Sequence, residues 1–237
     1  IAEFTRFHPL LNNKSFSEKE MTIFFDRKTM YIDLSDTYEL IFNRFQTSTR
    51  KQIKRCDHKY GLTVKIFEKD NTQLPVFYKI YTEAMDRVKS VSYLYFNEEY
   101  FQSLLETDST ALFIAYYEGE PIAAITAMYN SSYIHGHLGG ALTDYLHTSA
   151  YALLYAEMIK FGIDRGCKYF HAGGGVTSNP DDKLLKYKLN FSHTTTDFYI
   201  GKKVHNQSVY NEVIKQWKEK YPEKEEKYKN MILKYRY

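Results

Sequence analysis

Two cysteines, five prolines and one tryptophan are all that this chain of 237 residues contains of these residue types. Cys56 and Cys167 lie far apart and without metal-ligand spacing, which fits a reducing compartment and excludes a disulfide framework. No apolar run approaches the roughly 20 residues of a membrane span, and no signal peptide is visible. These absences predict a cytoplasmic protein with no membrane span and no metal site.

Excess charge is also scarce. The 32 Lys and Arg against 29 Asp and Glu leave a net charge of +3, which does not by itself indicate a nucleic-acid partner. One basic cluster could follow a tRNA acceptor stem or a polyphosphate, although a solvated helix face is the simpler interpretation. Its members are Arg50, Lys51, Lys54, Arg55 and Lys59.

Aromatic residues, in contrast, are abundant. The chain has 23 Tyr and 16 Phe, and 43% of its residues are hydrophobic. A chain of this length and composition can build a substantial core, and much of its packing should be aromatic with hydroxyls at the edges.

Hydrophobic periodicity predicts alternating strands and helices in the first half of the chain. Residues 22–34 read as two short strands around a polar turn, and Asp36 with Glu39 three positions on predicts a capping box. That helix should run to Gly61. We then expect a strand at 62–67, helices at 72–88 and after Asn97, and an antiparallel meander of strands at 111–117, 121–129 and 132–140.

The second half of the chain adds a helix with a narrow polar stripe at 148–166, which should be buried on most sides. It is expected to link the meander to a strand at 167–174 as a crossover. A last strand follows at 194–201, and the tail from Asn206 should be helical with a break at Pro222. The order predicts an α/β protein with a mixed sheet and helices on both faces.

A run of three glycines stands out in 169-YFHAGGGVTSNPDDKLLKYKLNFS-192. It matches neither GxxxxGK[ST] nor a GxGxxG that opens a helix, and Asp181 and Asp182 would repel phosphate. Two interpretations stay open. The segment is a flexible turn in which Asn179 or Asp181 caps the next helix, or the bare backbone of Gly173, Gly174 and Gly175 lets a substrate pass close to the strand end.

The order of strand, glycine-rich turn, polar loop and 184-LLKYKLNFS-192 resembles the Phe-Lys-x-x-Phe-Gly signature of FemAB-like transferases, a branch of the GNAT acyltransferase superfamily. Tyr187 and Lys188 stand at its Phe-Lys position, and Phe191 and Ser192 at its Phe-Gly position. Further similar segments are 6-RFHPLLNN-13, 31-YIDL-34, 77-FYKIYTEAMDR-87, 114-IAYYEGEPIAA-124 and 201-GKKVHNQSVY-210. The resemblance extends over nearly the whole chain.

The resemblance implies a GNAT-like, mostly antiparallel sheet and two GNAT-like halves in the family. Residues 1–34 would be the end of an N-terminal half, 35–201 a GNAT-like acyltransferase domain and 202–237 a C-terminal helical tail, which would explain the abrupt start at Ile1.

The implied reaction moves an activated acyl or aminoacyl group to an amine of a cell-envelope precursor, either a peptidoglycan peptide or an amino sugar. The donor is a co-substrate, aminoacyl-tRNA or acyl-CoA, with no tightly bound cofactor, and a homo-oligomer is left open. The alternatives are an acetyl-CoA-dependent N-acetyltransferase acting on a small amine or sugar, and a GNAT-fold module that binds a partner without catalysis.

The resemblance assigns Lys188 to contact with the acyl donor or to stabilisation of the oxyanion. The alternative is that Lys188 is a surface lysine of an amphipathic helix. The resemblance also assigns Arg87 to the acceptor's phosphates, with an ion pair to Glu83 as the alternative. Tyr187 would line the same cleft, unless it simply packs. His137 stands where the family often has Tyr, and its side chain suits a general base, although core histidines of strands are usually structural. His171 is a weaker candidate.

Donor binding is expected around Gly139 and Gly140 and at the helix start formed by Thr148 and Ser149. The Q/R-x-x-G-x-G/A pattern that acetyl-CoA enzymes of the superfamily carry before the central helix is missing. This weakens the acetyl-CoA interpretation.

Overall fold

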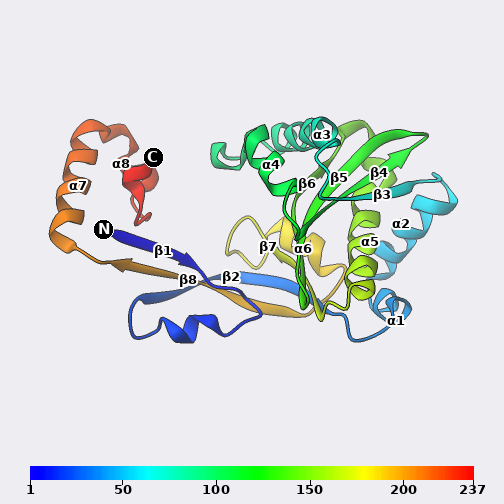
Figure 1. The fold of residues 1–237 in the computed structure, drawn as a ribbon, viewed down its shortest axis with the longest axis horizontal. Helices are drawn as coiled ribbons and strands as arrows, with labels where there is room; N and C mark the ends of the chain where they lie inside the picture. The colour runs from blue at the N-terminus through cyan, green and yellow to red at the C-terminus, as the bar shows by residue number, and fades with distance from the viewer. The chain divides into compact units, whose positions relative to one another are not determined.

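Eight strands form one sheet in the order β1-β8-β2-β7-β6-β5-β4-β3 in a computed structural model that describes residues 1–237 (Figure 1). The strands are β1 (Ala2–Arg6), β2 (Thr22–Asp33), β3 (Thr63–Glu68), β4 (Thr110–Tyr117), β5 (Glu120–Tyr129), β6 (Tyr133–Ala141), β7 (Tyr169–Gly174) and β8 (Thr195–Val204). Most pairs are antiparallel, whereas β6 and β7 are parallel. The predicted mixed, mostly antiparallel α/β sheet is therefore confirmed.

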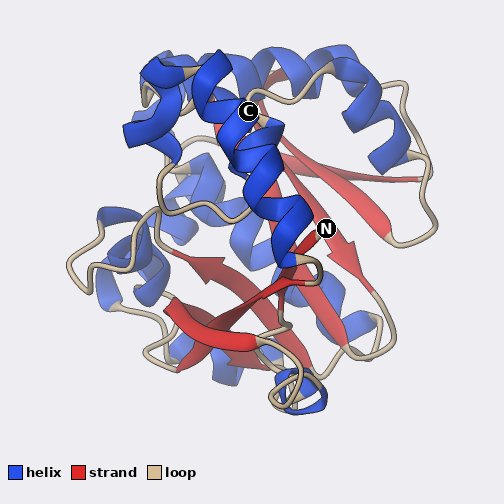
Figure 2. Cartoon of the chain, turned by 90° about the vertical axis from the view of Figure 1, so that its left-hand side faces the viewer, coloured by secondary structure: helices blue, strands red, loops and turns tan.

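The α-helices lie between the strands and after the last of them (Figure 2). They are α1 (Tyr38–Asn43), α2 (Thr47–His58), α3 (Leu74–Arg87), α4 (Glu98–Leu105), α5 (Ala150–Asp164), α6 (Lys183–Leu189), α7 (Gln207–Lys220) and α8 (Glu225–Tyr228). No helix combines the length and the apolar character that a membrane crossing requires.

The chain divides into two units. Unit 1 consists of Ile1–Thr29, Gly175–Pro180 and Thr196–Tyr237, and unit 2 of Met30–Gly174 and Asp181–Thr195. The long strands β2 and β8 contribute residues to both. The domain boundaries predicted from the sequence, after residues 34 and 201, refer to the two GNAT-like halves of FemAB-like proteins and stay a prediction.

Helices cover both faces of the sheet in unit 2. Side chains alternate along its strands, so that successive residues of β4 belong to two different cores. Ala111, Phe113 and Ala115 of β4 belong to a core shared with α1, α2 and α5. Leu112 and Ile114 belong instead to a second core with α3 and α4. The meander β4–β5–β6 and the α5 connection from β6 to the parallel strand β7 match the sequence prediction.

The prediction of two short strands at 22–34 was wrong, since β2 is a single strand of 12 residues. Its polar run stays extended because each charge finds a partner. Asp26 pairs with Arg27 at 2.5 Å, and Lys28 pairs with Asp197 of β8 at 2.5 Å. A polar stretch that looks like a turn can therefore continue a strand when its neighbour supplies the opposite charge.

The single helix expected between Asp36 and Gly61 is two helices. Thr37, not Asp36, is the N-cap of α1, and Asp36 instead forms an ion pair with Arg44 at 2.7 Å. The chain turns extended at Gln46, whose backbone N–H donates to the Asn190 carbonyl at 2.8 Å. This bond to a residue distant in sequence ends α1, and local sequence patterns do not reveal it.

The far end of β6 is fastened to α3 (Figure 1). A Cβ added to Gly140 would lie 2.4 Å from Ala84 Cβ, so only glycine lets the helix lie so close. The Arg87 guanidinium at the last turn of α3 donates to the Ala141 carbonyl at 2.7 Å. Glycine and arginine together hold β6 against the helix.

We expect Gly140→Ala to lower the free energy of unfolding by about 1–3 kcal/mol, because the new methyl group overpacks the contact with Ala84. Gly136→Ala on the same strand is the matched control, since its Cβ would first meet the flexible end of Met158 at 3.4 Å. Denaturant unfolding of both variants measures the difference. Equal loss in the two would show that the contact with α3 is not tight.

Candidate functional site

The parallel pairing of β6 with β7 stops partway along both strands. The paired residues are Tyr133 with Tyr169, Ile134 with Phe170 and His135 with His171, after which β6 continues to Ala141 and β7 to Gly174. Ile134 and Phe170 point into the core under α5 and are fully buried. The opposite face therefore carries the tyrosine pair and, at the end of the ladder, the histidine pair.

His135 and His171 are stacked at the end of this ladder. Their ring centroids are 4.9 Å apart with planes 24° from parallel, and their Nδ1 atoms are 2.9 Å apart. His135 Nδ1 also lies 3.0 Å from the His171 carbonyl oxygen, which can only accept. The hydrogen-bond geometry therefore assigns the proton to His135 Nδ1, with His171 Nδ1 as a second acceptor of that proton.

Lys188 brings a cation to the same place. It lies in the last turn of α6, whose N-cap Asp182 accepts from the backbone N–H groups of Leu184 and Leu185 at 2.9 and 3.1 Å. The Lys188 side chain is 8% exposed and its Nζ donates to the Gly174 carbonyl at 2.7 Å. Short as it is, α6 thus fixes the ammonium at the end of β7.

Gly173 separates the cation from the histidines. Its φ of +77° is a conformation that side chains disfavour. A Cβ added there would lie 3.3 Å from Lys188 Nζ and 3.8 Å from His135 Cε1. The bare backbone of Gly173 therefore lies between the Lys188 ammonium and the His135 imidazole.

The predicted base His137 lies one step further along the same face of β6. Its ring centroid is 6.1 Å from that of His135, and its Nε2 is 2.9 Å from the hydroxyl of Tyr100 on α4. Burial lowers the pKa of His137. Tyr100 in turn stacks on Phe96 with centroids 4.3 Å apart. The structure therefore brings His137 near His135 and gives it a fixed hydroxyl partner.

Tyr187 points elsewhere. Its ring packs against Tyr151, Tyr155 and Phe191, with centroids 6.5, 6.1 and 5.7 Å away. Burial raises the pKa of Tyr187 far above that of an ordinary phenol, so the hydroxyl stays protonated. These contacts describe a packing residue behind α6, and its catalytic role stays a prediction.

Arg87 and the glycines expected to bind the donor lie at the α3 end of β6. Arg87 also donates to Thr143 Oγ1 at 3.2 Å, and Glu83 accepts from the Thr143 backbone N–H at 2.7 Å. Gly139 faces a neighbouring strand, because an added Cβ would lie 2.4 Å from the Ala124 carbonyl oxygen. Gly140 contacts α3, as described above.

Thr148 and Ser149 precede α5. Thr148 is buried, and its hydroxyl donates to the Tyr145 carbonyl at 2.7 Å and accepts from the Ala150 N–H at 3.3 Å. Ser149 is the N-cap residue, with a φ of +63° and no capping bond from its side chain. The Thr148 hydroxyl is thus engaged by neighbouring backbone, and the donor-binding role of both residues stays a prediction.

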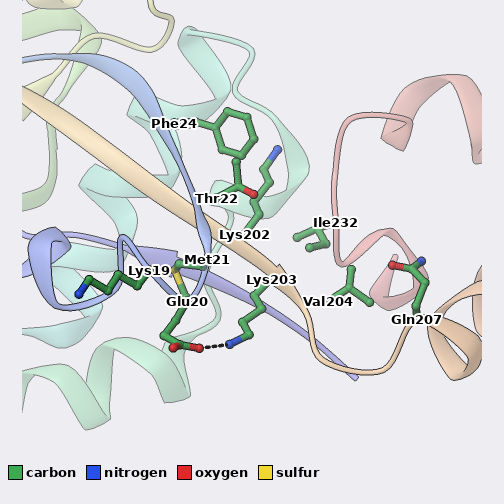
Figure 3. A pocket seen from close by; sticks show the side chains of 10 residues that line it. All are labelled: Lys19, Glu20, Met21, Thr22, Phe24, Lys202, Lys203, Val204, Gln207 and Ile232. Atoms are coloured by element: carbon green, nitrogen blue, oxygen red, sulfur yellow. Dashed lines mark hydrogen bonds and ion pairs between the residues drawn. The ribbon is translucent and has the colours of Figure 1, made fainter.

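Gly175 belongs to unit 1, where its carbonyl accepts from Arg27 Nη1 at 2.8 Å. The same unit holds a hollow of about 670 Å³ that contains the ion pair between Lys203 and Glu20 (Figure 3). Its lining residues are Lys19, Glu20, Met21, Thr22, Phe24, Lys202, Lys203, Val204, Gln207 and Ile232. No group of three or more His, Cys, Asp or Glu side chains in the chain is arranged to hold a metal ion.

Sequence reasoning missed the histidine pair as a unit. The alternation in 133-YIHGH-137 indicates that His135 and His137 share a face, but it does not say which residue of another strand lies opposite. The parallel register supplies His171. Tyr100 was missed as a site residue because no sequence motif connects it with His137, and only the tertiary structure brings α4 next to β6.

Residues 43–188 match the acetyltransferase (GNAT) domain family. A curated relative, the UDP-N-acetylmuramoylpentapeptide-lysine N(6)-alanyltransferase of Weissella viridescens, is 27% identical over 191 residues, which cover 79% of this chain. The chain spans about half of that relative's length, since the match covers 54% of it.

Among solved structures, the crystal structure of FemX matches with a TM-score of 0.64 at 13% identity, over 88% of this chain and 67% of FemX. L-PGS from Bacillus licheniformis matches with a TM-score of 0.60 at 15% identity, over 83% of this chain and 66% of that one. At these identities the two structures show a shared fold.

We expect Gly173→Ala to reduce any transfer activity by displacing Lys188 Nζ, in addition to destabilising the protein by roughly 1–2 kcal/mol through its left-handed backbone. Gly119→Ala is the matched control, with a φ of +86° and nothing within 4 Å of the added Cβ. Unfolding and turnover are measured for both. If Gly119→Ala lost as much activity, backbone strain alone would explain the effect.

Proposed function

We propose that this chain, which belongs to the acetyltransferase (GNAT) domain family, transfers an activated aminoacyl or acyl group to an amine of a cell-envelope precursor. It is a GNAT-fold acyltransferase distantly related to FemX. The relative from W. viridescens is named for an alanyl transfer to a lysine of a muramoyl pentapeptide. That name supports a peptidoglycan peptide as acceptor over an amino sugar.

The observation that carries the proposal is the position of Lys188. Its ammonium bonds to the Gly174 carbonyl beside Gly173, where the ladder between β6 and β7 has ended. An ammonium has three rotatable donors, so it can keep a backbone bond while turning toward a second oxygen. A cation held there before the substrate arrives is what a developing oxyanion requires.

The chemistry is an aminolysis. The amine attacks the carbonyl carbon of an ester or thioester, the carbonyl oxygen becomes an oxyanion, and the amine loses a proton. Lys188 stabilises the oxyanion, and the reacting carbonyl lies against the bare backbone of Gly173. Orientation of the two substrates and charge stabilisation together supply most of the rate enhancement in such a site.

The Arg87 guanidinium is proposed to contact a phosphate of the acceptor. Only its Nη1 is engaged with Ala141 and Thr143, and a guanidinium carries five donors in a planar fork that suits phosphate. In place of the alternative ion pair between Arg87 and Glu83, each side chain bonds separately to Thr143 after β6. Both bonds orient the end of α3.

Lys188→Met removes the charge but keeps the length of the side chain, and we expect turnover to fall roughly 100- to 1,000-fold, as for loss of one oxyanion donor. Lys186→Met is the matched control, because Lys186 lies on the same helix and pairs at the surface with Asp181. Single-turnover kinetics and thermal unfolding are measured together. A folded Lys188→Met variant with full turnover would contradict the role of Lys188, and a lack of turnover in the unaltered protein would favour the non-catalytic binding module.

The donor is identified by a separate comparison. We expect alanyl-tRNA to support transfer to a UDP-muramoyl pentapeptide, and coenzyme A to leave the thermal midpoint unchanged, because the glycine pattern for its pyrophosphate is missing from residues 139–152. Uncharged tRNA is the control for binding without a reactive ester. Stabilisation by coenzyme A together with acetyl transfer to a small amine would replace the proposal with the acetyltransferase alternative.

A further inference from the structure

The histidine pair at the end of the β6–β7 ladder has no role in the proposal above, which accounts for the oxyanion but not for the proton of the attacking amine. We infer that His135 is the base that accepts this proton and that His171 is the residue that positions it. The inference rests on the proposed function, since it assigns a second group to the same reaction. It differs from the sequence expectation, which gave the role to His137.

The geometry around His135 selects one tautomer. Because the His171 carbonyl can only accept, the Nδ1 proton of His135 is directed toward β7. In a neutral imidazole the other nitrogen, Nε2, then carries the lone pair, which is the state that a base needs. His171 Nδ1, 2.9 Å away, accepts from the same proton and holds the ring in place through stacking at 4.9 Å.

The position of His135 matches that of Lys188. Both lie beside the backbone of Gly173, since an added Cβ would be 3.3 Å from Lys188 Nζ and 3.8 Å from His135 Cε1. A carbonyl bound against this glycine would have a cation for its oxygen and an imidazole on the side of the nitrogen that attacks it. Gly173 therefore has a second reason to lack a side chain.

His137 is the weaker candidate for the base. Its Nε2 is already 2.9 Å from the Tyr100 hydroxyl, and its ring is not among the atoms within 4 Å of a Cβ added at Gly173. The two strand histidines share a face but differ in their partners, because His135 meets β7 and His137 meets α4. We infer that His137 and Tyr100 border the site on the side of α4.

The proton balance closes without another reactant. The amine nitrogen bonds to the carbonyl carbon, the π pair moves to the oxygen beside Lys188, and the proton on nitrogen passes to His135 Nε2. The tetrahedral intermediate then expels the alcohol or thiol of the donor, which takes the proton back from the imidazolium. An amide and a free alcohol or thiol leave, and His135 returns to its neutral form.

The pH dependence follows from this cycle. The base must be neutral in the free enzyme, so kcat/KM should fall with a slope of one proton as the pH drops through the histidine range, around 6.5 for an unperturbed imidazole. The titratable and charged groups around His135 include His171 on β7, Lys188 on α6, and His137 and Tyr133 on the same face of β6. On β5 its neighbour is Met128, which does not titrate.

His135→Asn tests the base, because the asparagine amide can still donate to the His171 carbonyl while Nε2 is gone. With alanyl-tRNA and UDP-muramoyl pentapeptide as probes, we expect kcat to fall roughly 100- to 10,000-fold with little change in KM, and the acidic limb of the pH profile to disappear. His193→Asn, at an exposed position, is the matched control. Retention of the acidic limb in a folded His135→Asn variant would overturn the assignment.

His171 is tested as a positioning residue. His171→Leu leaves the backbone carbonyl but removes the second acceptor of the Nδ1 proton and the stacked ring, so it should lower kcat and shift the acidic limb. His171→Asn, which can still accept through its side-chain oxygen, should recover most of both. A purely structural role would leave the pH profile in place. Equal pH profiles for the leucine and asparagine variants would therefore contradict the positioning role.

A measurement that needs no substrate separates this inference from the proposed function. In protein labelled with ¹⁵N-histidine, nitrogen chemical shifts distinguish the two neutral tautomers, and resonances are assigned by comparison with His135→Asn. We expect the Nδ1–H form for His135. If the wild-type protein transferred no alanine, the proposed function would fail, but the tautomer of His135 could still be measured. The Nδ1–H form would support the pairing of His135 with His171, and the Nε2–H form would overturn it.

Discussion

The sharing of β6 between two neighbours is the constraint on which the site depends. Its first three residues pair with β7, while its far end is held against α3 through Gly140 and by the Arg87 bond to Ala141. In both contacts a side chain of α3 meets the backbone of β6, which draws the end of β6 toward α3 and away from β7. The ladder therefore stops at His135 and His171, and the last residues of β7 are left for α6, whose lysine bonds to Gly174.

The two faces of this strand pair have opposite chemistry. Toward α5 they bury Ile134 and Phe170 completely, as a central helix packed on a sheet requires. The other face carries stacked tyrosines and then stacked histidines, with Tyr100 beyond them. Since the apolar face fixes the strands, the polar face can hold titratable groups without supporting the core. Stability and reactivity are thus separated by the two-residue period of a strand.

Much of the fold could be predicted because it depends on local patterns. The meander, α3 with Pro75 in its first turn, and α4 with its Asn97 cap all follow from periodicity and capping residues. The errors occurred where a distant partner decides the conformation. Lys28 of β2 meets Asp197 of β8, and Gln46 between α1 and α2 bonds to Asn190. No local pattern contains such a partner.

The site divides in the same way. Lys188 was predicted through a resemblance that places a lysine after a glycine-rich turn, and the structure puts its ammonium at that turn. Tyr187, its neighbour in the same motif, points about 100° away around the helix and packs on α5. A motif specifies residues in order but not the side of a helix that each one occupies. The partner of His135 depends on parallel register, which sequence alone does not give.

The bond between Lys188 and the Gly174 carbonyl also has an entropic consequence. A free lysine side chain samples many rotamers, and fixing one costs about 1.5–2 kcal/mol. Here that loss of freedom occurs during folding, when the Lys188 side chain is buried and its ammonium donates to the Gly174 carbonyl of β7. An incoming acyl group then meets a cation that is already immobile. The entropy cost of ordering this side chain is therefore part of the folding free energy of the domain. A more mobile lysine would incur that cost in every catalytic cycle.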